Sequence, residues 1–247
     1  MIQIKKCKRK RLVNCLWLIG VALCIVGCNN SNTQTERSET AKTDTVAEVY
    51  VELGFFGPVK PEKWAVLLAA VQNNVTHSRR EAGNLAFNLY LPENDTLQPI
   101  WFERFQTYKA HTLHMQQDYF KKAIAVIKQS LAGEALSIAL KDVKEVPAVN
   151  PKNRTAAHNS ITLYTVKPGS RQQFVTAMAN AAAKCRGLSN NVEYNLYQYK
   201  NEPEKFVLIE AWLNKPKNVQ EPEAEYFAAE PVRYMVKDIS ENKNVNH

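Results

Sequence analysis

Two stretches of the chain show the same succession of apolar patterns, a strand-like run followed by a helical one. Residues 49–56 and 160–166 are rich in β-branched and aromatic side chains, and a Lys-Pro dipeptide that interrupts strand pairing soon follows each run. Apolar residues then recur at the spacing of an amphipathic helix over 64–75 and 174–182. Each stretch is therefore predicted to begin with a strand and a helix.

In both stretches, turn-forming residues then lead into a hairpin, a short helical stretch and a last strand. The resulting order, β-α-β-β-α-β, is that of the split ferredoxin-like arrangement, so the predicted fold class is α+β. The predicted hairpin strands are 85–91 with 100–105 and 192–199 with 206–212, and the last strands are 136–143 and 232–239.

The two stretches are copies of one unit. Placed against itself at an offset of 107 residues, the chain aligns without a gap from Val59 to Phe120, in five blocks. Blocks in one register over this length indicate a duplication. After Phe120 the second copy is shorter by 11 residues, where the first has a helical pattern around 121–131. The matched blocks are Val59-Lys-Pro with Val166-Lys-Pro, Asn84 with Asn191, Asn88-Leu-Tyr with Asn195-Leu-Tyr, Glu103 with Glu210, and Tyr119-Phe with Tyr226-Phe.

The first residues resemble a secretion signal. A basic cluster precedes an apolar run over 12–27, which is shorter than the roughly 18 to 20 residues that a transmembrane helix needs. The run ends Ile-Val-Gly-Cys28, which resembles the bacterial lipobox, and lipidation of Cys28 would anchor the chain to a membrane. An ordinary signal peptide is the alternative. The predicted location is the cell envelope, facing away from the cytoplasm.

Composition divides the rest of the chain. Residues 29–46 are polar and lack the apolar side chains that order a segment. The predicted organisation is a signal peptide (1–27), a flexible tether (28–46), repeat one (47–145), a linker (146–157) and repeat two (158–240).

The signal also accounts for most of the positive charge and most of the cysteines. Residues 1–27 hold six Lys or Arg and no Asp or Glu, so their removal lowers the formal charge from +8 to +2. The charge therefore gives no reason to expect a nucleic-acid partner. With three cysteines in the signal and Cys28 acylated, only Cys185 remains, and the fold relies on no internal disulfide.

The residues of each repeat resemble the antibiotic biosynthesis monooxygenase family. The resemblance rests on Val59-Lys-Pro, Ser78-Arg-Arg-Glu-Ala-Gly-Asn84, Glu103-Arg-Phe105, Ala110, His114 and Tyr119-Phe120, in the order and spacing of the family pattern. It implies ferredoxin-like units whose sheets pair into a barrel, normally between two chains. The two repeats are therefore expected to form a pseudo-dimer within one chain, which could associate further into a homodimer.

The resemblance also implies a chemistry. Many members oxygenate dihydroxyarenes, quinols or anthrone-like compounds with O₂ and with no metal or flavin, because the ionised substrate supplies the electrons. A further branch degrades haem with a tryptophan and a histidine in one repeat. Here Trp212 lies in repeat two and His114 in repeat one, which disfavours haem. The expected substrate is a small aromatic or quinol-like compound, and no cofactor is expected.

The candidate site residues lie in repeat one. His114 occupies the position of the family histidine and is the candidate base, because an imidazole needs little tuning for proton transfer near neutral pH. Strand alternation places Trp101, Glu103 and Phe105 on one face of a strand, where Glu103 is a candidate catalytic acid and the two aromatic residues would contact the substrate. Because repeat two keeps the counterpart Glu210, a structural role for both glutamates is favoured.

Other side chains leave alternatives open. Asn84 and Asn88 could donate to a substrate oxygen, although such asparagines more often satisfy backbone groups at turns. His111 and His114 could form a metal pair, but no third ligand is visible. Repeat two has Glu221 and then Pro222 where repeat one has His114, so it is predicted to have lost the site. A lipoprotein that binds an apolar ligand or a protein without catalysis is the alternative to an enzyme.

Overall fold

A computed structural model describes residues 48–152, 156–214 and 221–241. The chain divides into two compact units, Met1–Asp44 and Thr45–His247, and all described residues belong to the second. The predicted signal peptide and the whole predicted tether, which begins with Cys28, lie outside the described residues. Among the described residues, no helix combines the length and the apolar character needed to cross a membrane.

Both repeats have the predicted strands and first helix, and each differs from the prediction of one helical stretch before its last strand. Repeat one has two helices between its third and fourth strands, whereas the described residues of repeat two have only a short 3₁₀ turn there. Repeat one comprises β1 (Tyr50–Phe55), η1 (Pro61–Lys63), α1 (Trp64–Ser78), β2 (Asn84–Pro92), β3 (Ile100–Phe105), α2 (Tyr108–Met115), α3 (Asp118–Ser130) and β4 (Leu136–Asp142). Repeat two comprises β5 (His158–Val166), η2 (Pro168–Ser170), α4 (Arg171–Gly187), β6 (Asn191–Tyr199), β7 (Lys205–Trp212), η3 (Ala224–Tyr226) and β8 (Phe227–Asp238).

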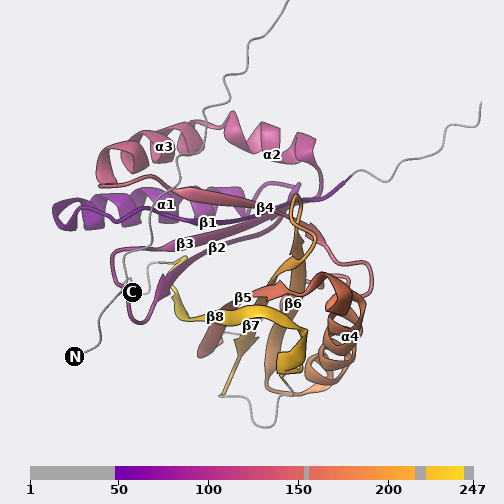
Figure 1. The fold of residues 1–247 in the computed structure, drawn as a ribbon. Coiled ribbons are helices and arrows are strands. Elements are labelled where there is room, and N and C mark those ends of the chain that lie inside the picture. The colour runs from indigo at the N-terminus through magenta and orange to yellow at the C-terminus, as the bar shows by residue number, and fades with distance from the viewer. Residues whose placement is uncertain (1–47, 153–155, 215–220, 242–247) are drawn as a thin grey trace, which may run out of the picture. The chain divides into compact units, whose positions relative to one another are not determined.

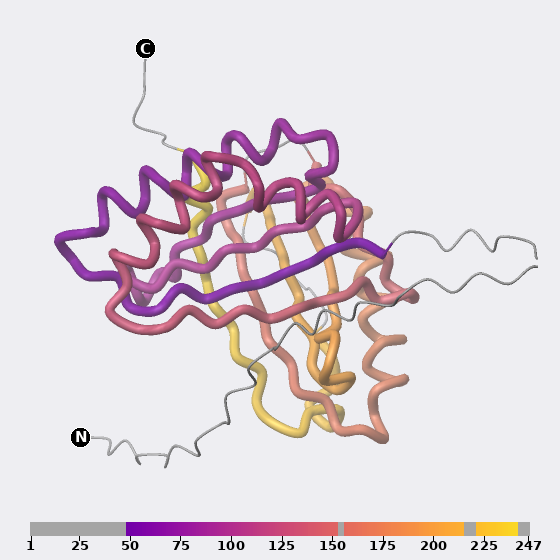
Figure 2. The backbone as a smooth tube through the Cα atoms, turned by 90° about the horizontal axis from the view of Figure 1, so that it is seen from above, coloured from indigo at the N-terminus to yellow at the C-terminus, as the bar shows by residue number. Residues whose placement is uncertain are grey.

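The strands of both repeats form one closed barrel in the order β1-β3-β2-β8-β5-β7-β6-β4. The last strand of each repeat joins the two halves, because β8 pairs with β2 and β4 pairs with β6. Figure 2 shows β8, in yellow, running from the strands of repeat two to those of repeat one. The predicted α+β pseudo-dimer within one chain is thus confirmed, and it leaves neither sheet with an unpaired edge.

The helices cover the outer faces of the two sheets. In Figure 1, α1, α2 and α3 lie over the strands of repeat one, and α4 lies along the outside of repeat two. One apolar cluster packs α1 on its sheet through Leu67 and Val71, and a second packs α4 through Phe174 and Met178. A third cluster fills the inside of the barrel. Each strand therefore presents one face to a helix and the other to the barrel interior.

The strand β8 begins five residues before the predicted Val232. Its first residues pair with β5, as in Val166 with Phe227. The residues matched in sequence, Tyr119-Phe120 and Tyr226-Phe227, therefore lie in different kinds of secondary structure. The first pair lies in the first turn of α3, whereas Tyr226 ends η3 and Phe227 begins β8. Without a counterpart of α3, this segment satisfies its backbone by strand pairing instead.

Candidate functional site

The third strand of repeat one presents its candidate residues to the helices. On β1, Gly54 pairs with Trp101, Glu52 with Glu103, and Tyr50 with Phe105. Trp101 packs with the cluster under α1, and the ring of Phe105 lies 5.3 Å from His111 of α2. The structure thus places Trp101, Glu103 and Phe105 on one helix-covered face.

His114 is fully buried between α2, α3 and this face. Its ring centroid lies 5.1 Å from Phe105 and 5.0 Å from Phe120. Its Nδ1 lies 2.7 Å from Oε1 of Glu81, and the hydroxyl of Tyr119 donates to the same oxygen. Its Nε2 is buried and has no hydrogen-bond partner among the described residues.

This arrangement fixes the role of each imidazole nitrogen. Oε1 of Glu81 accepts from Tyr119, and an ionised carboxylate offers lone pairs for a second donor, so Nδ1 of His114 carries a proton. In the neutral ring, Nε2 is then the lone-pair nitrogen. Burial, the hydrogen bond to Glu81 and its charge raise the pKa of the Tyr119 hydroxyl, which keeps it a donor. His114 therefore presents a proton acceptor to an aromatic environment.

His111 links Glu103 to a second group of polar side chains. Its Nε2 lies 3.4 Å from Oε1 of Glu103, and its ring stacks on Tyr50 with 3.6 Å between centroids. The Tyr50 hydroxyl donates to Glu52 at 2.6 Å, and Trp101 Nε1 donates to the same carboxylate at 3.0 Å. Burial, with the nearby Glu103 and Glu52, raises the pKa of Tyr50. Glu103 thus contacts α2 through His111.

Local features of the chain bring α2 close to the sheet. Thr107 caps α2, since its hydroxyl accepts from the amide of Ala110 at 3.0 Å. Gly83 lies against the same turn, where an added Cβ would be 2.5 Å from Cβ of Ala110. At the end of α1, Nε of Arg79 donates to the carbonyl of Phe87 at 2.8 Å. These contacts hold the turn that carries Glu81 beside α2.

The two candidate asparagines lie apart from each other. The amide of Asn84 donates to the hydroxyl of Ser78 at 3.1 Å and to the carbonyl of Ala86 at 3.4 Å, next to Phe105. Asn88 pairs with Phe102, a core residue of the barrel, and donates to Oδ2 of Asp238 at 3.1 Å. The structure therefore brings Asn84 near the helix-covered face, whereas Asn88 faces the barrel interior.

Repeat two has different chemistry at the equivalent place. Glu221, at the position of His114, forms an ion pair with Arg233 at 2.8 Å, and Leu188 occupies the position of Glu81. Arg233 also donates to the hydroxyl of Thr162 at 3.0 Å. Glu210, the counterpart of Glu103, accepts from Ser160 at 3.1 Å, and burial raises its pKa.

The sequence reasoning gave no role to Glu81 or Tyr119, although both lie in the quoted motifs. The signal for Glu81 was that repeat two lacks the carboxylate and the histidine together, having Leu188 and Glu221 at these positions. Among the described residues, no three His, Cys, Asp or Glu side chains are grouped to hold a metal ion.

Comparisons with known proteins agree with this fold. A protein from Fusobacterium nucleatum named as a "putative monooxygenase" is 18% identical, with a TM-score of 0.66, over 78% of this chain and 93% of that chain. A protein of the same description from Lactobacillus acidophilus is 13% identical, with a TM-score of 0.68, over 78% and 94%. An "anthrone oxidase-like protein" is 13% identical, with a TM-score of 0.50, over the same shares.

The aligned share of this chain is large enough that both repeats take part in these similarities. A search of curated proteins found no match. The model of the family described as "Antibiotic biosynthesis monooxygenase" matches residues 50–126 and 158–221, which together exceed half of the chain. The chain therefore belongs to the antibiotic biosynthesis monooxygenase family, with one copy of the domain in each repeat.

Proposed function

We propose that repeat one is a cofactor-independent monooxygenase site for a small aromatic or quinol-like substrate, with His114 as its base. The observation that carries the proposal is the bond between Nδ1 of His114 and Glu81, because it leaves Nε2 as a buried proton acceptor. A carboxylate that holds a histidine in this way also stabilises the positive charge that forms when the ring takes a proton.

The reaction begins when Nε2 of His114 takes a proton from the substrate hydroxyl or from the acidic carbon next to its ring. The ionised substrate transfers electrons to O₂, which adds to a carbon of the substrate. In an anthrone-like substrate, one oxygen atom stays on the CH₂ carbon, which loses its two hydrogens as the new C=O forms, and the other oxygen leaves as water. In a quinol, one oxygen atom stays on a ring carbon, whose C–H becomes C–OH, the two hydroxyl groups lose their hydrogens to give the quinone, and the other oxygen leaves as water. The four electrons that reduce O₂ thus come from the substrate. Buried Phe105 and Phe87 give this step an apolar surrounding that excludes water.

Access to the base requires motion. His114 is fully buried, so a substrate reaches Nε2 only when α2 or α3 moves away from the sheet. In this proposal Glu103 would act through His111, which it contacts. Trp101 would line the far end of the helix-covered face of β3. Repeat two, with its Glu221 to Arg233 ion pair, would support the fold without catalysis.

Incorporation of labelled oxygen tests the reaction. The full chain is incubated with ¹⁸O₂ and anthrone-like phenols, quinols or catechols, and we expect one ¹⁸O atom in the product and one in water. His114→Ala should abolish incorporation. If no substrate is labelled above the autoxidation control, while one of them binds equally well to the wild-type protein and to His114→Ala, the chain is instead a binding lipoprotein.

The location of the protein is a second part of the proposal. The apolar run ending at Gly27-Cys28 supports a chain anchored in the cell envelope through acylated Cys28, facing away from the cytoplasm. Metabolic labelling with a radioactive fatty acid in a bacterial host tests it. The wild-type chain should carry the label and sediment with membranes, and Cys28→Ala should do neither. Equal labelling of both would contradict lipidation.

A further inference from the structure

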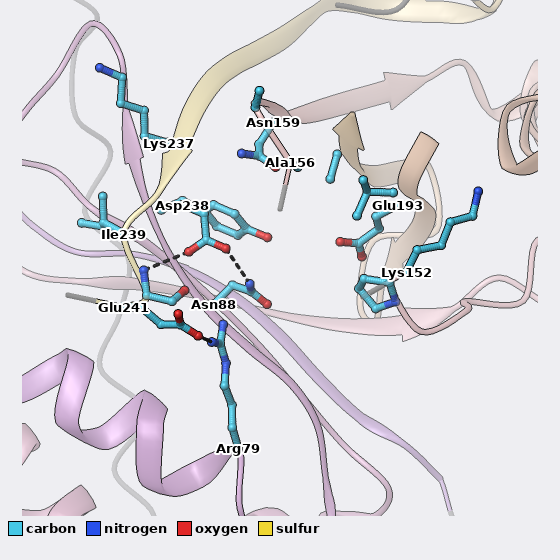
Figure 3. Close-up of a pocket in the computed structure, with 16 residues that line it drawn as sticks. Arg79, Asn88, Lys152, Ala156, Asn159, Glu193, Lys237, Asp238, Ile239 and Glu241 are labelled. Atoms are coloured by element: carbon cyan, nitrogen blue, oxygen red, sulfur yellow. Dashed lines mark hydrogen bonds and ion pairs between the residues drawn. The ribbon is translucent and has the colours of Figure 1, made fainter. Parts of the chain in front are cut away.

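A cavity of about 530 Å³ lies at one end of the barrel, on the opposite side of the sheet from His114. We name it the barrel-end cavity. Its wall includes Asn88 and Tyr90 of β2, Asp238 of β8, Asn159 of β5, Glu193 of β6 and Ala211 of β7. Figure 3 shows the carboxylate of Glu193 directed across this space toward Asn88 and Asp238. The volume is that of a site for a small organic molecule.

The duplication supplies an internal comparison for this end of the barrel. In repeat one, Ala86 pairs with Arg104, and Nη2 of Arg104 forms an ion pair with Asp142 at 2.7 Å. In repeat two, Glu193 pairs with Ala211 at the equivalent positions. Asp238 is the counterpart of Asp142, since both follow a lysine at the end of the last strand of a repeat. One half of the barrel end therefore contains an arginine, and the other contains an alanine beside the cavity.

With this exchange, two carboxylates have no ion-pair partner among the described residues. Glu193 is 7% exposed, and its Oε1 accepts from the amide of Asn195 at 2.8 Å. Asp238 accepts from Asn88 at 3.1 Å and from the amide of Ser240 at 2.9 Å. No ion pair among the described residues joins a lysine or arginine to either carboxylate. A buried carboxylate without a cation is costly, and a bound cation would remove that cost.

The described basic residues on the cavity wall contact groups other than Glu193 and Asp238 or extend away from Glu193. Arg79 pairs with Glu241 at 3.1 Å, and Nζ of Lys152 donates to two backbone carbonyls, those of Arg186 and Leu188. Figure 3 shows the side chain of Lys237 extending away from Glu193. The wall therefore offers a cation the two carboxylates and the side-chain carbonyls of Asn88 and Asn159.

We propose that the barrel-end cavity binds a small organic cation, an ammonium or guanidinium compound, between Glu193 and Asp238. The cation takes the place that the guanidinium of Arg104 occupies in the other half of the barrel. This site lies on the face of the sheet away from His114, and it does not depend on the proposed oxygenase reaction. The ligand is expected to be apolar in its middle part, where Tyr90 and Ala211 form the wall.

The charges around Glu193 give the binding a pH signature. Burial is the main cause that raises the pKa of Glu193 to about 7; the charge of Asp238 adds to the rise, and the hydrogen bond from Asn195 and the charges of Arg104 and Arg186 oppose it. Near neutral pH a fraction of the molecules therefore carries a proton on this carboxyl, and a cation that binds to the ionised form displaces that proton into solution. We expect proton release on binding at pH 7 and less release at pH 8.5.

Calorimetry on the full chain in detergent tests the site, with butane-1,4-diamine as the probe. Butane-1,4-diol and butanedioate serve as neutral and anionic controls of similar length. We expect the diamine to bind at least about tenfold more tightly than either control, which corresponds to about 1.4 kcal/mol. Titrations in buffers of different ionisation enthalpy measure the released proton.

Variants separate this site from nonspecific binding. Glu193→Gln keeps an acceptor for Asn195 and should weaken diamine binding at least tenfold, as should Asp238→Asn. Ala211→Arg places an arginine at the position equivalent to Arg104 and should abolish binding. Asp118→Asn, a change at an exposed carboxylate on α3, should leave it unchanged. Binding of the diol as tight as that of the diamine, no binding of the diamine, or equal affinity in Glu193→Gln would overturn the proposal.

Discussion

The two histidines of α2 differ in what each ring nitrogen contacts. His111 contacts Glu103 through Nε2 and stacks its ring on Tyr50, and both contacts serve the packing of α2. His114 has one nitrogen on Glu81 and the other without a partner among the described residues. Both rings are buried, so burial does not distinguish them. His114 is distinguished as the proposed base by its unpartnered ring nitrogen.

Glu81→Gln tests the positioning role of Glu81. The neutral amide does not stabilise the charge that forms on His114 during proton transfer, so kcat should fall about 10- to 100-fold with little change in KM. Nitrogen NMR of His114 should show a mixture of ring tautomers in the variant and one tautomer in the wild-type protein. A parallel rise in KM with an unchanged tautomer would indicate a purely structural role.

Glu193→Gln tests how burial of this carboxyl affects stability. The pKa of Glu193 is raised from 4.5 to about 7, so the folded chain loses stability relative to the unfolded chain as pH rises through that interval. The variant should match the wild-type free energy of unfolding at pH 4 and exceed it at pH 8, by on the order of 3 kcal/mol. Urea unfolding at both pH values measures the difference in unfolding free energy between the variant and the wild-type protein. The same difference at pH 4 and at pH 8 would contradict a raised pKa of Glu193.

Sequence reasoning could identify His114 but not its partner. Glu81 and His114 are separated by 33 positions and lie on a turn and a helix, and no periodicity relates such elements. Asn88 shows the opposite case. Alternation along β2 places Asn88 and Phe87 on opposite faces of the sheet, and Phe87 faces His114. The sequence did not indicate which of these two faces the helices would cover.

At the scale of elements, the position of α2 decides the geometry of the site. The helix is short, and its contacts with the rest of repeat one include the stack of His111 on Tyr50 and the close approach of Ala110 to Gly83. The presence of strands and helices could be predicted from apolar periodicity, because each pattern reflects a buried face. The early start of β8 could not, because it depends on pairing with β5 rather than on local pattern.

Gly83→Ala tests the packing of α2. The added Cβ would lie 2.5 Å from Cβ of Ala110, so α2 must shift, at a cost of about 1 to 3 kcal/mol of unfolding free energy. Gly169→Ala is a matched control, because no atom lies within 4 Å of its added Cβ. Ala110→Gly should restore the stability lost in Gly83→Ala. Equal stability of the two alanine variants in urea unfolding would show that α2 is not held at this contact.

At the scale of the molecule, the last strand of each repeat closes the barrel with the other repeat. The pairs β2 with β8 and β4 with β6 make one folding unit from two sequence repeats. The resemblance predicted this pseudo-dimer, and the fold confirms it. The cavity between the halves was not predicted, because its wall joins residues from strands of both repeats that no local pattern in the sequence relates.

Separation of the repeats tests this dependence. Residues 45–146 alone would expose the edges of β2 and β4, so they should form a homodimer that closes the barrel, or aggregate. Sedimentation of this fragment and of the full chain in detergent measures the difference. A stable fragment monomer with a cooperative unfolding transition would contradict the view that each repeat needs the other.

Oxygen consumption tests the central claim most directly. The full chain, without added metal or flavin, is assayed with menadiol, catechols and anthrone-like phenols beside two matched variants, His114→Gln and Glu221→Gln. The account predicts uptake that His114→Gln lowers at least about 100-fold and that Glu221→Gln leaves unchanged, because only repeat one has the base. Uptake that survives His114→Gln, or no uptake above autoxidation with any substrate, would contradict a monooxygenase site centred on His114.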